Sequence, residues 1–375
     1  MSPRSGRTTI AQRFIAGLEF IVSLSVREAD DRVLPDQSPA DFLSPVSRAL
    51  HKNSDVDPST KGAGLFSFVR CADSNRLLHI LLVAIAIGLV ASCSRQLAPP
   101  SSSATREVTD EAGRRVVLPV KIDRIVSLAP NLTEIVYAVG AGDRLVGDTT
   151  YCDYPDAAKN VAKVGDTMNP SIERIVALKP QVVLVSTASQ LEAFTSQLSA
   201  QQIAAYVTNP QSLDDVFHSI QTLGDLLNEH EHSAGIVAAL RKRATAIEAA
   251  AGTGKQVKVF YQVSGEPLYT IGRDAFLTDL IKRAGGASVT ADVSGAFPRF
   301  SDEAALAAKP DAIILPTGGS MGEGNSKVVT ALKNSPAVLS GRVYKINGDL
   351  LSRPGPRLVD GLEEIARALH PEAFK

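Results

Sequence analysis

The chain has 375 residues, of which 44% are hydrophobic and 21% charged, and its formal net charge at pH 7 is -1. This length allows two domains of ordinary size, and the near-neutral charge gives no reason to expect nucleic acid or an anionic membrane surface as a partner. The three cysteines, Cys71, Cys93 and Cys152, form no Cys-x-x-Cys pair. The sequence therefore predicts neither a disulfide framework nor a metal site.

An uncharged apolar segment covers residues 77–89 and follows Arg70 and Arg76. It is too short to span a bilayer and has the length of a signal-peptide core. It leads into Val90-Ala-Ser-Cys93, which resembles a bacterial lipobox, the motif whose cysteine is acylated and becomes the mature N-terminus. We therefore expect residues 69–93 to be a lipoprotein signal peptide, with lipidation at Cys93. The alternative is an uncleaved anchor helix, and either interpretation predicts an exported, tethered protein.

Residues 1–68 do not fit in front of a signal peptide, because they are charged and contain Ser and Pro throughout. Apart from Met1, no Met precedes Met168. We expect translation to begin at an alternative codon near Val69, so that residues 1–68 are not part of the protein. The alternative is a disordered cytoplasmic extension.

The exported part begins with a tether and a hairpin over residues 94–121. Residues 94–105 are a flexible tether, and residues 106–118 have the pattern of a hairpin. An N-terminal lobe is expected over 122–228, where strands alternate with helices and predict a parallel sheet covered on both faces. Its expected strands are 125–128, a strand from 146, 182–186 and 203–207, and its expected helices are 132–139 and 189–201.

Residues 213–251 have a helical pattern almost throughout. We expect an Ala-rich bridging helix over 229–253, and a helix of about twenty residues spans about 30 Å, enough to run along a small domain. A second α/β block, the C-terminal lobe, is expected over 254–375. Its expected elements are the strands 257–263, 312–315 and 343–346, the loop 264–268, and the helices 274–284 and 356–369.

Two segments of the chain are closely similar. Residues 171–187 and 301–317 both run Ser-x-Glu, a short helical stretch, Lys-Pro and a buried strand that ends in Thr. Self-similarity at long range indicates a duplicated unit, and two facing α/β lobes predict a ligand cleft between them. Lys-Pro before a strand is also common helix-stop chemistry.

Several motifs resemble the cobalamin-type substrate-binding proteins of ABC importers and their haem- and siderophore-binding relatives. They are Ile125-Val-Ser-Leu-Ala-Pro-Asn-Leu-Thr-Glu134, Val146-Gly, Tyr151-x-Asp-Tyr-Pro155, Glu173-Arg-Ile-Val-Ala-Leu-Lys-Pro180 and Leu351-Ser-Arg-Pro-Gly-Pro-Arg-Leu-Val-Asp-Gly-Leu362. The resemblance covers roughly residues 106–370. It implies two Rossmann-like α/β lobes joined by one long helix, a ligand cleft between the lobes, and a small closing motion.

The resemblance also implies site residues and partners. Glu173 and Glu303, one on each lobe, would dock into Arg pockets of the transmembrane permease subunits; a favourable position at a helix N-terminus is the other interpretation. The cleft residues carried over are Pro130, Asn131, Tyr151, Tyr269, Phe297 and Arg353, and we add Phe300 from its loop position. Arg353 is expected to meet a propionate or amide of the ligand rim, or simply Asp349.

The sequence departs from the cobalamin binders, which have Trp where this chain has Thr167, Ser186 and Phe297. We expect a monomer that captures a corrinoid such as cobalamin, or another planar metal chelate, without a cofactor of its own, and that meets the membrane only through its lipid anchor. Haem or ferric-siderophore capture is the alternative. An exported chelatase or hydrolase is the alternative of another class, although no catalytic motif supports it. Cys152 has the pattern of a small buried residue rather than of a metal ligand.

Overall fold

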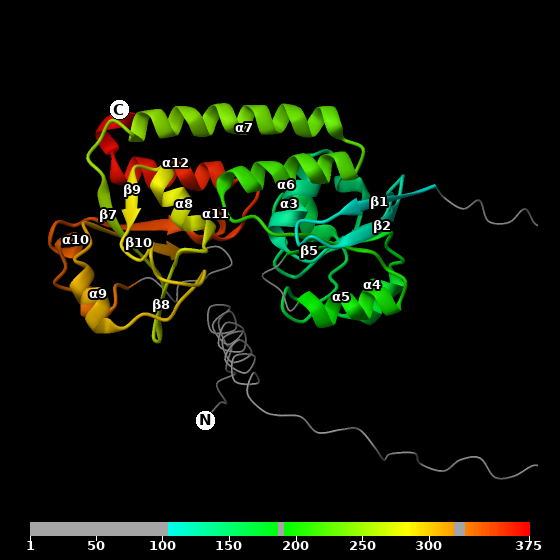
Figure 1. The fold of residues 1–375 in the computed structure, drawn as a ribbon, viewed down its shortest axis with the longest axis horizontal. Coiled ribbons are helices and arrows are strands. Elements are labelled where there is room, and N and C mark those ends of the chain that lie inside the picture. The colour runs from blue at the N-terminus through cyan, green and yellow to red at the C-terminus, as the bar shows by residue number, and fades with distance from the viewer. Residues whose placement is uncertain (1–103, 187–190, 319–326) are drawn as a thin grey trace, which may run out of the picture. The chain divides into compact units, whose positions relative to one another are not determined.

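The computed structural model describes residues 104–186, 191–318 and 327–375 (Figure 1). It begins with the predicted hairpin, in which β1 (Thr105–Thr109) pairs antiparallel with β2 (Arg115–Pro119). The carboxylate of Asp110 holds the turn, because it accepts hydrogen bonds from the backbone N–H groups of Ala112 and Arg114. The predicted signal peptide and Cys93 lie outside the described residues. Within these residues, no helix combines the length and the hydropathy that crossing a membrane requires.

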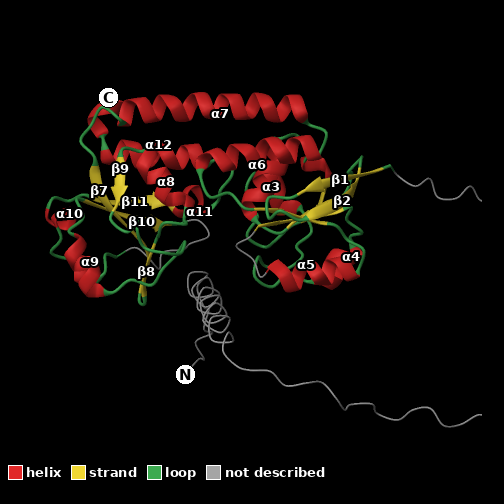
Figure 2. Ribbon diagram, in the orientation of Figure 1, coloured by secondary structure: helices red, strands yellow, loops and turns green. Residues whose placement is uncertain are grey.

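The N-terminal lobe is built on a parallel sheet with the strand order β4-β3-β5-β6, and helices lie on both sides of its strands (Figure 2). Its strands are β3 (Ile125–Ser127), β4 (Leu145–Gly147), β5 (Val182–Ser186) and β6 (Ala205–Thr208). Its connections are α3 (Pro130–Ala138), η1 (Gly142–Arg144), η2 (Asp156–Asn160), α4 (Ile172–Ala177) and α5 (Leu191–Ala200). Every residue of β5 is buried, as in a parallel strand that is covered on both faces. The predicted alternation of strands and helices is confirmed.

The C-terminal lobe has a parallel sheet with the order β9-β7-β10-β11. Its strands are β7 (Val257–Gly265), β9 (Gly286–Ser288), β10 (Ala312–Thr317) and β11 (Val343–Asn347). Its helices are α8 (Phe276–Arg283), α9 (Asp302–Ala308), η4 (Thr330–Leu332), α10 (Pro336–Leu339), α11 (Gly348–Ser352), α12 (Leu358–Leu369) and η5 (Pro371–Phe374). When the parallel strands of each lobe are numbered along the chain, they lie side by side in the order second, first, third, fourth. This shared order confirms the duplicated unit.

One strand departs from the parallel pattern. β8 (Leu268–Thr270) folds back antiparallel on β7, where the sequence predicted a loop over 264–268. All three residues of β8 are buried, so the hairpin removes apolar side chains from water. A strand of three residues is too short to show a period of two. β9, α10 and α11 were not predicted either, because each is too short to show the hydrophobic period of its element.

The two similar segments also share their local geometry. The hydroxyls of Ser171 and Ser301 cap α4 and α9, each accepting a hydrogen bond from the backbone N–H three residues on. At the other end, Lys179 and Lys309 adopt the left-handed conformation, with φ of 47° and 43°. A left-handed residue ends a helix, and the proline that follows each lysine cannot continue it. The helix-stop interpretation and the repeat therefore both hold.

Two helices occupy the region that the sequence predicted as almost continuous. α6 (Leu213–Leu226) ends before α7 (His230–Ala251) begins. The helical conformation is interrupted at Asn228, whose φ is 60°. α7 packs against α6 and α12, yet it buries only Ser233, Ala244, Ile247 and Ala251. Much of its attachment is ionic: Arg241 pairs with Asp214, Arg243 pairs with Asp360 and Glu363, and Glu248 pairs with Arg283.

The hydrophobic core runs from one lobe into the other. One cluster joins α3 and α6 of the N-terminal part to α7, β7, α8 and α12. Two smaller clusters lie within single lobes, one around Ile175 and Val183 and one around Phe260 and Ile313. Because a close-packed interior resists shear, the continuous core favours a small relative motion of the lobes.

Candidate functional site

The candidate site is formed by loops that follow strands of both sheets. β3 ends just before α3, β4 leads into a loop around Tyr151, and β11 leads into α11 and the segment 353–357. Because all three strands are parallel members of their sheets, their carboxyl ends lie at the edge where α/β proteins place their ligands. Side chains from these loops meet across the two lobes.

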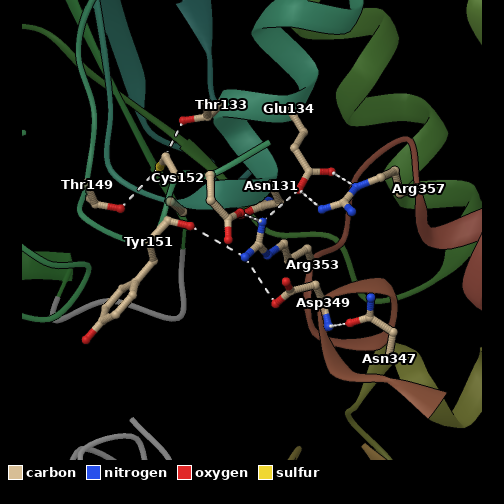
Figure 3. A network of polar contacts seen from close by, with 12 residues as sticks. Asn131, Thr133, Glu134, Thr149, Tyr151, Cys152, Asn347, Asp349, Arg353 and Arg357 are labelled. Atoms are coloured by element: carbon tan, nitrogen blue, oxygen red, sulfur yellow. Dashed lines mark hydrogen bonds and ion pairs between the residues drawn. The ribbon is translucent and has the colours of Figure 1, made fainter. Parts of the chain in front are cut away.

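Arg353, which follows α11, is the centre of this meeting point (Figure 3). Its Nη1 atom lies 3.1 Å from Glu134 Oε1 and 2.7 Å from Asp153 Oδ1. Its Nη2 atom lies 3.1 Å from Asp349 Oδ1 and donates a long hydrogen bond of 3.5 Å to the carbonyl of Tyr151. The guanidinium therefore joins two carboxylates of the N-terminal lobe to one of its own lobe.

Arg357 makes the second connection between the lobes. Its Nε and Nη2 atoms donate to the two oxygens of Glu134, at 2.9 and 2.6 Å, a bidentate geometry that combines strength with specificity. Its guanidinium also lies over the ring of Tyr154, 4.0 Å from the centroid, within the range of a cation–π interaction. We call Glu134, Asp153, Asp349, Arg353 and Arg357 the inter-lobe charged cluster.

Burial and charge act against each other in this cluster. Burial opposes the charge of Arg353, but the hydrogen bond to Asp153 and the charge of Asp349 outweigh it and raise the pKa of the guanidinium. Partial burial likewise opposes ionisation of Asp153, but the hydrogen bond and charge of Arg353 lower the pKa of this carboxyl below its usual value. Both groups are therefore ionised at neutral pH.

The loop that carries Tyr151 is held in place by hydrogen bonds from buried and part-buried polar side chains. Lys163 donates to Asp148 Oδ1 at 2.7 Å and to the carbonyls of Cys152 and Ala158. Asp148 is fully buried, and burial raises the pKa of its carboxyl to about 6, against the opposing effect of Lys163. The hydroxyls of Thr133 and Thr149 lie 3.1 and 3.2 Å from the sulfur of buried Cys152, and burial raises the pKa of this thiol.

The predicted residues of the N-terminal lobe lie at or beside the cluster. Pro130 is the first residue of α3. Asn131 is buried, and its side-chain amide donates to the carbonyl of Pro354 at 3.3 Å, so it contacts the other lobe directly. Tyr151 turns its carbonyl toward Arg353 and its ring away from the cluster (Figure 3). Arg353 does pair with Asp349, and it also pairs with Glu134 and Asp153, which were not predicted as its partners.

The other predicted residues lie on the β8 side of the C-terminal lobe. Tyr269 is buried in the core on β8 and forms an isolated bridge with Arg299. Phe300 donates its backbone N–H to Leu268 and packs its ring 6.0 Å from that of Phe260. Phe297 is half-buried against the core. Core packing therefore accounts for Tyr269 and for much of Phe300.

Three cluster residues were missed as site residues: Glu134, Asp153 and Arg357. All three stand inside motifs that carry the family resemblance. The available signal was the charge itself, because Glu134 is an acidic residue among apolar ones in α3, and Arg353 and Arg357 flank a rigid Pro-Gly-Pro segment. Which carboxylate meets which guanidinium depends on the packing of the lobes, and no local pattern carries that information.

The two residues predicted to contact a permease have equivalent settings. Glu173 and Glu303 are exposed and lie in the first turn of α4 and α9. Backbone and Ser301 hydrogen bonds lower the pKa of Glu303. Each carboxylate is therefore available to a partner, one on each lobe.

The family model described as periplasmic binding protein matches residues 125–350. The match spans more than half of the chain, and the chain belongs to this family. It is 33% identical over 278 residues to the uncharacterised ABC transporter substrate-binding lipoprotein YvrC of Bacillus subtilis, covering 72% of this chain and 86% of that protein. It is 28% identical over 255 residues to a vitamin B12-binding protein of Vibrio parahaemolyticus, covering 68% and 91%.

Solved structures with the same fold include two with 27% sequence identity and a TM-score of 0.60. One is the periplasmic vitamin B12 binding protein BtuF of Vibrio cholerae, where the match covers 68% of this chain and 98% of that one. The other is the periplasmic haem-binding protein RhuT of Roseiflexus sp. RS-1 in apo form, with 67% and 99%. The chain is thus a substrate-binding protein of an ABC importer, and the predicted two-lobed α/β fold is confirmed.

Proposed function

We propose that this protein captures a corrinoid of the cobalamin type outside the cytoplasm and delivers it to the transmembrane subunits of an ABC permease. The observation that carries the proposal is the inter-lobe charged cluster beside Tyr151, at the carboxyl ends of strands from both lobes. A corrinoid is wide and largely apolar with a polar rim, and such a ligand suits aromatic walls beside a few fixed polar groups. The likeness to vitamin B12-binding relatives over nine-tenths of their length supports the same ligand.

In this proposal the ligand lies between Tyr151 of the N-terminal lobe and Phe297 of the C-terminal lobe, in a cleft bordered by Pro130, Asn131 and Arg353. Tyr269 and Phe300 complete the ligand-binding residues on the β8 side of the site. Glu173 and Glu303 contact the permease. The protein acts as a monomer that is anchored to the outer face of a membrane through lipidated Cys93, and it releases its ligand chemically unchanged.

Haem or ferric-siderophore capture is the second candidate. The equal likeness to the haem-binding protein RhuT favours it, as does the absence of Trp at positions 167 and 186. Calorimetric titration of the purified protein with cyanocobalamin, haem and a ferric siderophore, each alone, separates the candidates. We expect saturable binding of cyanocobalamin with an unchanging absorption spectrum. Binding of haem alone would replace the corrinoid proposal, and a spectrum that changes with time would indicate an enzyme.

A further inference from the structure

The members of the inter-lobe charged cluster differ greatly in exposure. The side chains of Glu134, Arg353 and Asp349 are 2%, 4% and 9% exposed, whereas that of Asp153 is 48% exposed. Asp153 therefore presents a carboxylate at the open side of the cluster, and the guanidinium groups lie behind it. A ligand that approaches the cluster beside Tyr151 meets this carboxylate first.

Neither arginine of the cluster lacks a carboxylate partner. Arg353 is held by Glu134, Asp153 and Asp349, and Arg357 is held by Glu134 in a bidentate pair. Three carboxylates against two guanidinium groups leave the cluster with a formal charge of -1. A ligand carboxylate would have to displace one of these partners and would gain no uncompensated positive charge, whereas an amide N–H or a hydroxyl could donate to the exposed oxygen of Asp153.

We infer that the inter-lobe charged cluster selects a metal chelate whose rim carries uncharged amides and rejects one whose rim carries carboxylates, with Asp153 as the discriminating residue. The inference rests on the proposed function and specifies its ligand class. Specificity of this kind comes as much from repulsion of the wrong ligand as from attraction of the right one. Asp153 stays ionised under physiological conditions, because Arg353 lowers the pKa of its carboxyl.

One cation near the predicted contact residues would favour a ligand with a carboxylate rim instead. Arg299 is exposed and lies between Phe297 and Phe300, in the loop that pairs with β8. If a carboxylate rim were accepted there, affinity for an anionic chelate would depend on Arg299. The Arg299→Ala variant therefore belongs in the test.

The experiment compares cyanocobalamin with the separated monocarboxylic acids that hydrolysis of one rim amide produces, and with haem. Binding to the purified protein is measured at pH 7 and low salt. We expect cyanocobalamin to bind about tenfold more tightly than at least one of the monocarboxylic acids, since one charge repulsion at close range is worth about this factor. Asp153→Asn keeps the shape of the side chain and removes its charge, and should reduce this ratio to about threefold or less. Haem should bind less tightly than cyanocobalamin, and Arg299→Ala should not change this.

Asp156→Asn is the matched control, because Asp156 lies three residues from Asp153, at the start of η2, but is 93% exposed and pairs only with Lys159 among the described residues. It should leave the ratio unchanged. The inference is overturned if every monocarboxylic acid binds the unmodified protein as tightly as cyanocobalamin, if Asp153→Asn leaves the ratio unchanged, or if tight haem binding depends on Arg299. If cyanocobalamin itself does not bind, the proposed function fails, and this inference fails with it.

Discussion

Glu134 and Arg357 form a two-point ion pair between the lobes, although 223 residues separate them in the chain. The carboxylate of Glu134 is almost completely buried and accepts from Arg353 as well. A buried pair of this kind adds little to stability by itself, but removing one partner leaves an uncompensated buried charge. The geometry therefore fixes how the lobes face each other.

Replacing Glu134 tests this relationship. We expect Glu134→Gln to lower the free energy of unfolding by about 3 kcal/mol, because Arg357 loses its carboxylate and Arg353 loses one of three. Urea denaturation at pH 7 measures the change. Lys159→Ala removes one partner of an exposed pair and should leave the stability nearly unchanged. Equal effects of the two variants would contradict a structural role for the Glu134 pair.

The buried carboxyl of Asp148 predicts a pH dependence. Its pKa is about 6 in the folded protein against an ordinary value of 3.8, so between these pH values the folded state holds more protons than the unfolded state. Stability from this group is then present below pH 4 and is lost as the pH rises through about 6. The stability of Asp148→Asn relative to the unmodified protein should rise by about 2 kcal/mol between pH 4 and pH 7. Denaturation curves at both pH values give this difference, and a constant difference would contradict the raised pKa.

The exposed glutamates predict a separation of capture from delivery. Glu173→Ala combined with Glu303→Ala should leave the ligand affinity nearly unchanged and weaken binding to the permease in detergent or nanodiscs, with the larger effect at low salt. Glu372→Ala removes an exposed carboxylate near the C-terminus and serves as the control. Permease binding by the double variant at the level of the control would show that these helices are not the docking sites.

The aromatic residues of the proposed cleft predict a loss of affinity. Tyr151→Ala and Phe297→Ala should each weaken binding of cyanocobalamin by about 1–3 kcal/mol, the scale of a buried aromatic contact. Calorimetry measures the affinity, and circular dichroism checks folding. Phe374→Ala provides a control, because Phe374 stacks on Arg367 near the C-terminus and belongs neither to the proposed cleft nor to the inter-lobe charged cluster. Two folded variants with unchanged affinity would place the ligand elsewhere.

The N-terminal part of the chain predicts a modification. We expect Cys93 to carry the lipid and residues 1–92 to be absent from the mature protein, because the segment combines charge, an apolar core, small residues and cysteine. Intact-mass measurement of membrane-extracted protein tests both statements. A Cys93→Ser variant should be released from the membrane. An unmodified Cys93 in the extracted protein would argue for an uncleaved anchor helix.

The sequence predicted those parts of the structure that local chemistry determines. The repeated Ser-x-Glu, the Lys-Pro that ends each helix and the apolar strand that follows it mark the repeat in the sequence, and the structure adds the helix caps at Ser171 and Ser301. The site was predicted less fully. Arg353 was expected beside Asp349, which lies four residues away, but Glu134 and Asp153 reach it only through the packing of two lobes. Tyr269 was predicted as a cleft residue from the family resemblance, and this stays a prediction; its burial follows from β8, a strand too short to recognise in the sequence.

Apolar packing and ion pairs together hold α7 against the rest of the protein. Ala244, Ile247 and Ala251 belong to the core, and Ile236, Val237 and Leu240 pack against it. The guanidinium and carboxylate pairs along the helix also connect it to α6, α8 and α12. Such pairs weaken as mobile ions accumulate around them. The attachment of α7 is thus partly coupled to the ionic strength of the surrounding medium, whereas the continuous hydrophobic core that joins the lobes is not.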